Sequence, residues 1–338
     1  LLVLQLSLCR SFLYSQNIPA QANDIKFEIL NSEDGLSYNK VQCILQDGQG
    51  YLWFGTVNGL NRYDGYSFRV YSNSPGDSAT IAGNDIVSLY QDKESIIWIG
   101  GVISSFSAYN PRTETFKNYL IPNVKTEIHD FLEDENNLMW IATGAGLYSF
   151  EKKGNKLIFY ATDDSARENI HGILRDANKD ILWLSTETGF RKFNKKTGAV
   201  KKYSIAYPGF ADISKEITHN IIADNNGNLW MSTTSQGVYQ LNPQTEKLTR
   251  HEINFANVFP SPGKTVTRIL KDSDGKILLC GDGLAVFNPL QQSFTFYYPG
   301  IEDSKGIPAK IRTVLKDKSD IYWIGTERGI AKYDPKLN

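Results

Sequence analysis

The 338-residue chain is predicted to be an all-β protein, a seven-bladed β-propeller, on three observations. Its six tryptophans recur at intervals of 42 to 47 residues apart from one doubled interval, and they are Trp53, Trp98, Trp140, Trp183, Trp230 and Trp323. Leu278 stands where the doubled interval lacks its tryptophan, so one unit recurs seven times. The units lack the three- and four-residue apolar spacing of helical repeats. A period in the forties, made of short β-rich runs, favours propeller blades over the alternative, a solenoid.

Each unit begins with three short runs that are rich in β-branched and aromatic residues and are separated by Gly, Asn or Asp. In unit one these runs cover residues 41–47, 51–56 and 60–64, and in unit seven residues 311–317, 321–326 and 330–334. Such runs, broken by tight turns, predict antiparallel strands joined by hairpins. A fourth strand is predicted in five units, at residues 68–71, 115–119, 157–160, 200–203 and 294–297. Every blade is therefore expected to be a four-stranded antiparallel sheet.

Unit seven reaches residue 338 without a fourth strand, whereas unit one is preceded by a spare alternating run at residues 25–30. We predict that this N-terminal run pairs with the strand around Ile330 to Tyr333 and completes the last blade. Closing the ring in this way leaves only short, protected sheet edges.

Residues 1–22 are predicted to be a leader, and residues 23–338 a single propeller. The first eight residues are mostly apolar, and the segment resembles the end of a secretory signal with cleavage after Ser15. The alternative is a disordered apolar leader. The apolar run is too short to span a bilayer, so no direct membrane insertion is expected.

Composition excludes some partners. The net charge of −1 and the pI near 6.5 provide no basic field, so neither nucleic acid nor an anionic membrane is an expected partner. Of the three cysteines, Cys9 lies in the leader, while Cys43 and Cys280 fall in units that are not neighbours in the ring. No disulfide is expected.

Two residue types recur in nearly every unit, and both are expected to be structural. An aspartate ends each first strand, at Asp47, Asp92, Asp134, Asp176, Asp224, Asp272 and Asp317. Seven equivalent carboxylates around a ring cannot all be catalytic, and their place before a hairpin predicts side chains that accept hydrogen bonds from turn N–H groups. The tryptophans are expected to pack between adjacent blades.

The second position of each first strand varies instead. Around the ring it is Gln42, Val87, His129, His171, His219, Thr267 and Arg312. Because the first strand of a blade is innermost, the three histidines are expected to converge at the mouth of the central channel, where they could bind a ligand or a metal. The alternative is that polar residues simply line a wet channel. The predicted ligand-binding set is His129, His171, His219, Gln42, Arg312, Tyr38 and Asn39, with no catalytic residue, metal or cofactor assigned.

The repeats resemble the two-component regulator propeller family. The match runs through Val41-x-x-Ile44-x-x-Asp47-x-x-Gly50-x-Leu52-Trp53-Phe-Gly-Thr56-x-x-Gly59-Leu60-x-Arg-Tyr-Asp64, with Glu33-Asp-Gly-Leu36-Ser before it and Asp64-Gly-Tyr-Ser-Phe68 after it. It covers the chain from about residue 25 and weakens in unit six. In that family such repeats form the periplasmic sensor region of hybrid two-component systems, common in Bacteroidetes, which often detect oligosaccharides. Members usually carry further domains, including a transmembrane helix and a histidine kinase.

The resemblance implies an exported, periplasmic sensor domain whose full-length protein is anchored in the inner membrane and forms a homodimer through downstream domains. An oligosaccharide or another small polar ligand is the expected partner. No enzymatic activity is assigned to these residues, since the kinase would lie in other domains. The alternatives are a propeller lyase or hydrolase with a histidine site at the channel mouth, and a structural scaffold module.

Overall fold

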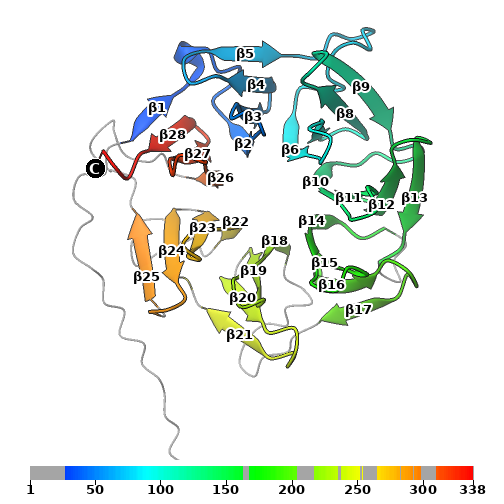
Figure 1. Cartoon of the computed structure of the whole chain (residues 1–338), viewed down its shortest axis with the longest axis vertical. Coiled ribbons are helices and arrows are strands. Elements are labelled where there is room, and N and C mark those ends of the chain that lie inside the picture. Colours follow the sequence, from blue (N-terminus) through cyan, green and yellow to red (C-terminus); the bar gives the residue numbers. More distant parts are fainter. Residues whose placement is uncertain are drawn as a thin grey trace, which may run out of the picture.

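The computed structural model describes residues 27–162, 167–203, 217–234, 237–251, 253, 265–281, 283–291, 293–297 and 310–337. Seven four-stranded antiparallel sheets stand around a central opening (Figure 1), which confirms the predicted seven-bladed β-propeller. The leader and its proposed cleavage site lie outside the described residues.

In blades one to six the strands follow the order of the chain from the centre outward, and in blade seven the outer strand is the N-terminal β1. Blades one to four are β2 (Val41–Gln46), β3 (Leu52–Thr56), β4 (Gly59–Tyr63) and β5 (Phe68–Tyr71); β6 (Ile86–Gln91), β7 (Ile97–Gly101), β8 (Ser105–Asn110) and β9 (Thr115–Leu120); β10 (Ile128–Glu133), β11 (Met139–Thr143), β12 (Gly146–Glu151) and β13 (Lys156–Tyr160); and β14 (Ile170–Arg175), β15 (Ile181–Thr186), β16 (Gly189–Asn194) and β17 (Val200–Tyr203). Blades five to seven are β18 (Thr218–Ala223), β19 (Leu229–Thr233), β20 (Val238–Leu241) and β21 (Leu248–His251); β22 (Val266–Lys271), β23 (Ile277–Gly281), β24 (Leu284–Asn288) and β25 (Ser293–Tyr297); and β26 (Ile311–Lys316), β27 (Tyr322–Thr326), β28 (Gly329–Tyr333) and the N-terminal β1 (Glu28–Leu30). The outer strand β21 has no counterpart among the fourth strands predicted from the sequence.

The ring closes as predicted. Strand β1 pairs antiparallel with β28, with Ile29 opposite Ala331 and Leu30 opposite Ile330. Leu30 is buried in one cluster with Ile330 and with residues of blade one. A short 3₁₀ helix, η1 (Ser32–Asp34), then leads the chain into blade one. The N-terminal strand therefore joins the first and last blades through both its backbone and its side chains.

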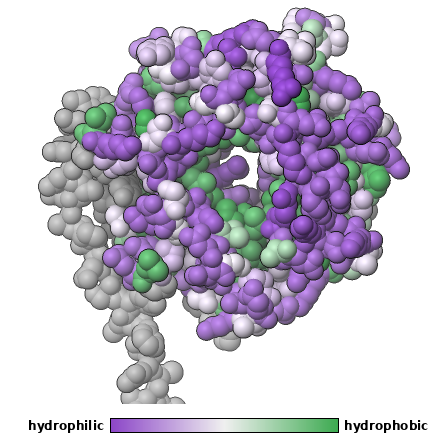
Figure 2. Space-filling view, viewed as in Figure 1, coloured by the Kyte–Doolittle hydropathy of each residue, from purple (hydrophilic) through white to green (hydrophobic). Residues whose placement is uncertain are grey.

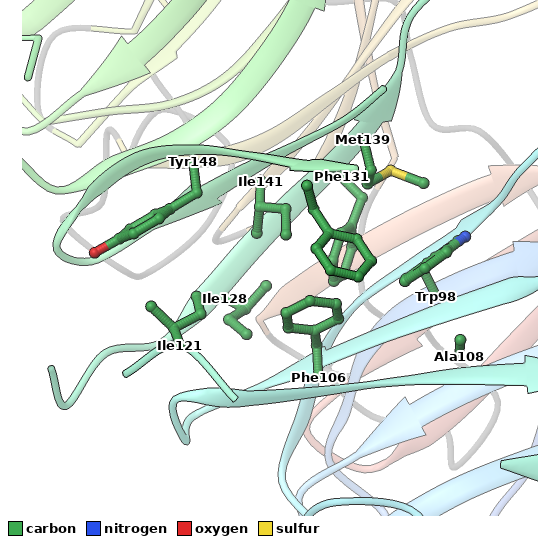
Figure 3. Packing of buried hydrophobic residues seen from close by; sticks show 10 residues of the cluster. Trp98, Phe106, Ala108, Ile121, Ile128, Phe131, Met139, Ile141 and Tyr148 are labelled. Atoms are coloured by element: carbon green, nitrogen blue, oxygen red, sulfur yellow. The ribbon is translucent and has the colours of Figure 1, made fainter. Parts of the chain in front are cut away.

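Large apolar side chains fill the space between neighbouring blades. Between blades two and three, Trp98 and Phe106 face Phe131 and Met139 (Figure 3), and all four are almost completely buried. Six further clusters of the same kind are described around the ring. The tryptophans are therefore core residues wedged between blades, as expected.

The turn between the second and third strands uses a threonine and a glycine together. In blade one Thr56 donates a hydrogen bond from Oγ1 to the carbonyl of Gly59, 3.0 Å away, and accepts one from the N–H of Asn58. Gly59 has φ of +119°, a conformation that a side chain would strain. The same Thr–Gly contact is made by Thr143, Thr186, Thr233 and Thr326.

Every innermost strand has a register shift near its start. In β10 the pairing with β11 is interrupted between Ile128 and Asp130, and in β14 the pairing with β15 is interrupted between Ile170 and Gly172. All seven innermost strands share the irregularity at the corresponding place. A β-bulge redirects side chains and ends regular pairing. The end of the channel where these strands begin is therefore built differently from the opposite end.

Candidate functional site

The variable second position of the innermost strands falls at the bulge in every blade. The residues there are all partly exposed. Because the innermost strands border the central opening (Figure 1), these side chains form a ring at the end of the channel where the strands begin. We call this the open end.

The structure brings the three predicted histidines together. The ring centroids of His129 and His171 are 5.0 Å apart, and those of His171 and His219 are 5.6 Å apart. His219 Nε2 lies 3.0 Å from Thr234 Oγ1. In contrast, Nε2 of His129 and Nε2 of His171 are buried and have no hydrogen-bond partner among the described residues. We call these three residues the histidine arc.

The surroundings of His129 and His171 favour their neutral form. Burial, reinforced by the neighbouring His129 and His219, lowers the pKa of His171 to about 3. Burial also lowers the pKa of His129, although Glu127 acts in the opposite direction. A neutral imidazole has one nitrogen that donates and one that accepts, so the arc is suited to hydroxyl groups of a polar ligand.

Gln42 and Arg312 lie in the same ring but are engaged with neighbouring residues. Gln42 Nε2 donates hydrogen bonds to Asp85 Oδ1 and to the carbonyl of Ile86, which tie blade one to blade two. Arg312 Nε donates to Glu327 Oε1 over 2.8 Å. A ligand that used either side chain would have to share it with these contacts.

Tyr38 and Asn39 precede the first strand of blade one. Tyr38 is 49% exposed, whereas Asn39 Oδ1 accepts a hydrogen bond from the N–H of Ser32 in η1. Asn39 therefore has a structural contact in addition to its predicted role.

The recurrent aspartates lie at the opposite end of the innermost strands, which we call the closed end. Their Oδ1 atoms accept the turn N–H bonds that the sequence predicted, as Asp224 does from Asn226 and Asn228. Their Oδ2 atoms accept the indole N–H of the tryptophan in the same blade, over 2.8 to 3.0 Å in five blades and also between Trp183 and Asp176. The sequence analysis missed this second contact. Its signal was present, because five of these aspartates stand six residues before a tryptophan.

The sequence analysis also missed the third position of the innermost strands. Its residues are Cys43, Ser88, Asp130, Gly172, Asn220, Arg268 and Thr313. Ser88 Oγ donates to the carbonyl of Ile128 over 2.7 Å, and Asp130 Oδ2 accepts the N–H of Ile173 over 3.0 Å, so these side chains connect neighbouring blades. We call this set the third-position ring. The sequence signal was the same variability that marked the second position.

Two further properties bear on possible functions. Within the described ranges, no group of three or more His, Cys, Asp or Glu side chains is placed to hold a metal ion. No helix in the part of the chain that is described has both the length and the hydropathy for a membrane crossing.

Comparison with known proteins identifies the repeats. The two-component regulator propeller model matches residues 35–58 and 80–102, which cover parts of units one and two. Histidine kinase P4 of Formosa agariphila is 42% identical over 66 residues, a match that covers 20% of this chain and 5% of the kinase.

Solved structures share the fold over most of the chain. The extracellular domain of a protein assigned as a hybrid two-component system, from B. thetaiotaomicron, superposes with a TM-score of 0.75 at 25% identity and covers 92% of this chain. The chain spans 42% of that structure's length. Virginiamycin B lyase from Staphylococcus aureus superposes with a TM-score of 0.70 at 13% identity, over 91% of this chain and 98% of the lyase, a likeness that shows the fold alone. Two of the seven units therefore match the repeat of the two-component regulator propeller family.

Proposed function

We propose that this propeller is the periplasmic ligand-sensing part of a hybrid two-component sensor histidine kinase, and that it responds to an oligosaccharide. The proposal draws on the extracellular sensor domain with the same fold and on the local match to a histidine kinase. The kinase reaction would belong to other domains of such a sensor.

The histidine arc is the observation that carries the binding site. Unpaired buried nitrogens are rare in proteins, because each costs free energy unless a ligand or water satisfies it. Here Nε2 of His129 and Nε2 of His171 are both buried without a hydrogen-bond partner among the described residues, although His129 Nε2 lies 3.9 Å from Glu127 Oε2. The two rings lie side by side at the open end. Their neutral rings match the hydroxyl groups of a saccharide.

We infer that signalling uses the rigidity of the ring. A ligand that binds one packing arrangement of the propeller and its neighbouring domains more tightly than another shifts their equilibrium. In a kinase dimer such a shift would reach the catalytic domains. Crosslinking across the dimer of a full-length sensor, with and without ligand, should give two different patterns, and identical patterns would contradict this mechanism.

A thermal-shift screen of the propeller against neutral and acidic oligosaccharides tests the binding site. A saccharide that binds should raise the melting temperature of the wild type and do so much less for His171→Ala. His251→Gln is the matched control, because His251 stacks on Trp230 in the body of blade five. Stabilisation that is the same in His171→Ala and in the wild type would place the ligand elsewhere. Product formation would favour a lyase or hydrolase instead, and no stabilisation by any saccharide would favour a scaffold.

A further inference from the structure

Arg268 stands apart from the rest of the third-position ring. It follows the bulge of β22 and pairs with Cys280 of β23, so it begins at the wall of the bore in blade six. Its side chain is partly buried, yet it makes no hydrogen bond, ion pair or ring contact with the described residues. A guanidinium keeps its charge at any pH at which the protein is folded. A half-buried cation without a partner requires either water or an anion.

Arg268 acts electrostatically on buried groups of two other blades. Burial raises the pKa of Asp130 in blade three, and Arg268 offsets part of that rise. Arg268 has the same lowering effect on Cys43 in blade one, whose pKa burial raises to about 12. One side chain can influence blades one and three from blade six only if it extends into the bore that they share. Figure 2 shows this central opening in the ring.

Asn220 supplies a second set of free donors beside Arg268. Its Oδ1 accepts the N–H of Ile269 over 3.0 Å, and this contact fixes which end of the amide faces the backbone. The Nδ2 group is then left without a hydrogen bond to any residue in the described ranges. Because Ile269 follows Arg268 directly, the amide donors lie next to the base of the arginine.

Asp130 acts on this arginine only at a distance. Its two oxygens accept the N–H groups of Ile173 and Phe131, and no ion pair with Arg268 forms. Asp130 is also the only carboxylate of the third-position ring. The open end of the bore therefore contains a cation and an amide that have donors to spare and no acceptor of their own.

We propose that Arg268 and Asn220 bind a carboxylate group of the ligand, with the guanidinium fork on both carboxylate oxygens and the amide on one of them. The chemistry is the bidentate pairing of a planar guanidinium with a planar carboxylate. Along each innermost strand, the second position, which holds the histidine arc, is about 3.3 Å from the third position. The arc would therefore bind hydroxyl groups of the same molecule. This inference deepens the proposed function and rests on it, because it selects acidic over neutral ligands at that site. A uronate unit of a glycan and a free organic acid both carry the required group.

Calorimetric titration of the propeller with galacturonate, galactose, acetate and sodium sulfate tests the proposal. Galacturonate should bind the wild type saturably and much more tightly than galactose. Arg268→Gln should weaken galacturonate about ten- to a hundredfold, the loss expected for one charged hydrogen-bonding group. Arg69→Gln is the matched control, because that arginine lies in the outer strand β5 of blade one and is paired with Glu114. Circular dichroism and melting curves show whether each variant is folded, and Arg268→Lys provides a second variant that keeps the charge without the fork.

Each outcome of these titrations either supports the proposal or overturns it. Acetate bound as tightly as galacturonate would make a free organic acid the source of the carboxylate, whereas galacturonate bound alone points to a uronate. Equal affinity of wild type and folded Arg268→Gln or Arg268→Lys for galacturonate overturns the proposal, as does sulfate binding that matches galacturonate. Neutral oligosaccharides that bind through the histidine arc, with no gain from a carboxylate, would refute this inference and leave the proposed function intact. Absence of binding by both neutral and acidic ligands would refute both.

Discussion

The two ends of the bore are formed by the same seven strands, but they satisfy their polar groups in opposite ways. At the closed end Asp224 accepts hydrogen bonds from two turn N–H groups, from Asn228 Nδ2 and from Trp230. At the open end Arg268 and Nε2 of His171 have no partner among the described residues. The closed end repeats the same residue types from blade to blade, whereas the open end varies. Recurrent columns in this propeller therefore stabilise the blades, and variable columns provide the candidate binding site.

Lysines reinforce the closed end further. Lys152 Nζ lies 2.6 Å from both Asp92 Oδ2 and Glu133 Oε1, and it joins blade three to blade two. Lys195 Nζ lies 3.1 Å from Asp134 Oδ2 and joins blade four to blade three. All of these side chains are largely buried. Such pairs are costly to break, because removing one partner leaves a buried charge.

Opening the ring should have the largest effect, because both ends depend on closure. A chain that begins at residue 31 lacks β1, which leaves Ile330 and the edge of β28 uncovered. Loss of two apolar side chains from the core and of the strand pairing should cost about 5 kcal/mol. The melting temperature should fall by on the order of 10 °C relative to a chain that begins at residue 25. Calorimetry of the two chains measures this.

Lys332→Ala is the control for that experiment. It removes the exposed ion pair between Lys332 and Glu28 but keeps the strand pairing. We expect a change below about 1 kcal/mol. Equal melting temperatures for the chains that begin at residues 25 and 31 would reject closure by β1.

The next largest effect should be a difference in stability between an aspartate variant of blade five and one of blade six. Asp224→Ala leaves the buried indole N–H of Trp230 without an acceptor, whereas Asp272→Ala does not, because Leu278 replaces the tryptophan there. Both variants lose two turn hydrogen bonds and one further side-chain contact, from Asn228 Nδ2 to Asp224 and from the Tyr322 hydroxyl to Asp272. Asp224→Ala should therefore cost about 1–3 kcal/mol more than Asp272→Ala. Urea unfolding measures both, and equal losses would show that the aspartates act only on their turns.

The repeated elements were predictable from the sequence because each depends on local chemistry. The turn role of Asp47 and its counterparts follows from an Asp before a hairpin, and pairing of residues 28–30 with β28 follows from a spare strand at one end and a missing one at the other. The convergence of His129 and His171 followed from their equivalent positions. Arg268 could not be found in this way, because its lack of a partner depends on the bulge and on what the other blades place around the bore.

Acid should affect the two ends in separate pH ranges. The pKa of His171 is depressed to about 3, so the folded state favours the neutral ring. Stability is then complete above the unfolded pKa of about 6.5 and declines as the pH falls below it, by about 2.5 kcal/mol at pH 4.5. At Asp224 burial raises the pKa, but the hydrogen bonds from Trp230 and Asn228 outweigh burial and leave the pKa lowered. That contribution is lost only below about pH 4.

Urea midpoints of His171→Gln and of the wild type between pH 7 and 4.5 measure how much of the loss of stability in acid comes from His171 at the open end. The variant should lose less stability than the wild type over this range. The slope of its unfolding free energy against pH should be smaller by the equivalent of about one bound proton. His251→Gln shows the share of a histidine outside the arc, since burial lowers the pKa of His251 to about 4. A slope that is the same in wild type and His171→Gln would mean that His171 is protonated in the folded protein.

The smallest effect concerns how deep the open end extends. Burial raises the pKa of the Cys43 and Cys280 thiols to about 12, and both are free. Since the thiolate is the reactive form, neither should react with iodoacetamide at pH 8 in the native state, and both should react once the protein is unfolded in guanidinium. Peptide mapping by mass spectrometry distinguishes them. Cys43 belongs to the third-position ring, whereas Cys280 lies behind it in β23. Native labelling of Cys43 but not of Cys280 would mean that the open end admits small molecules into the wall between blades one and two. The accessible part of the open end would then extend beyond the second-position side chains to the third-position ring.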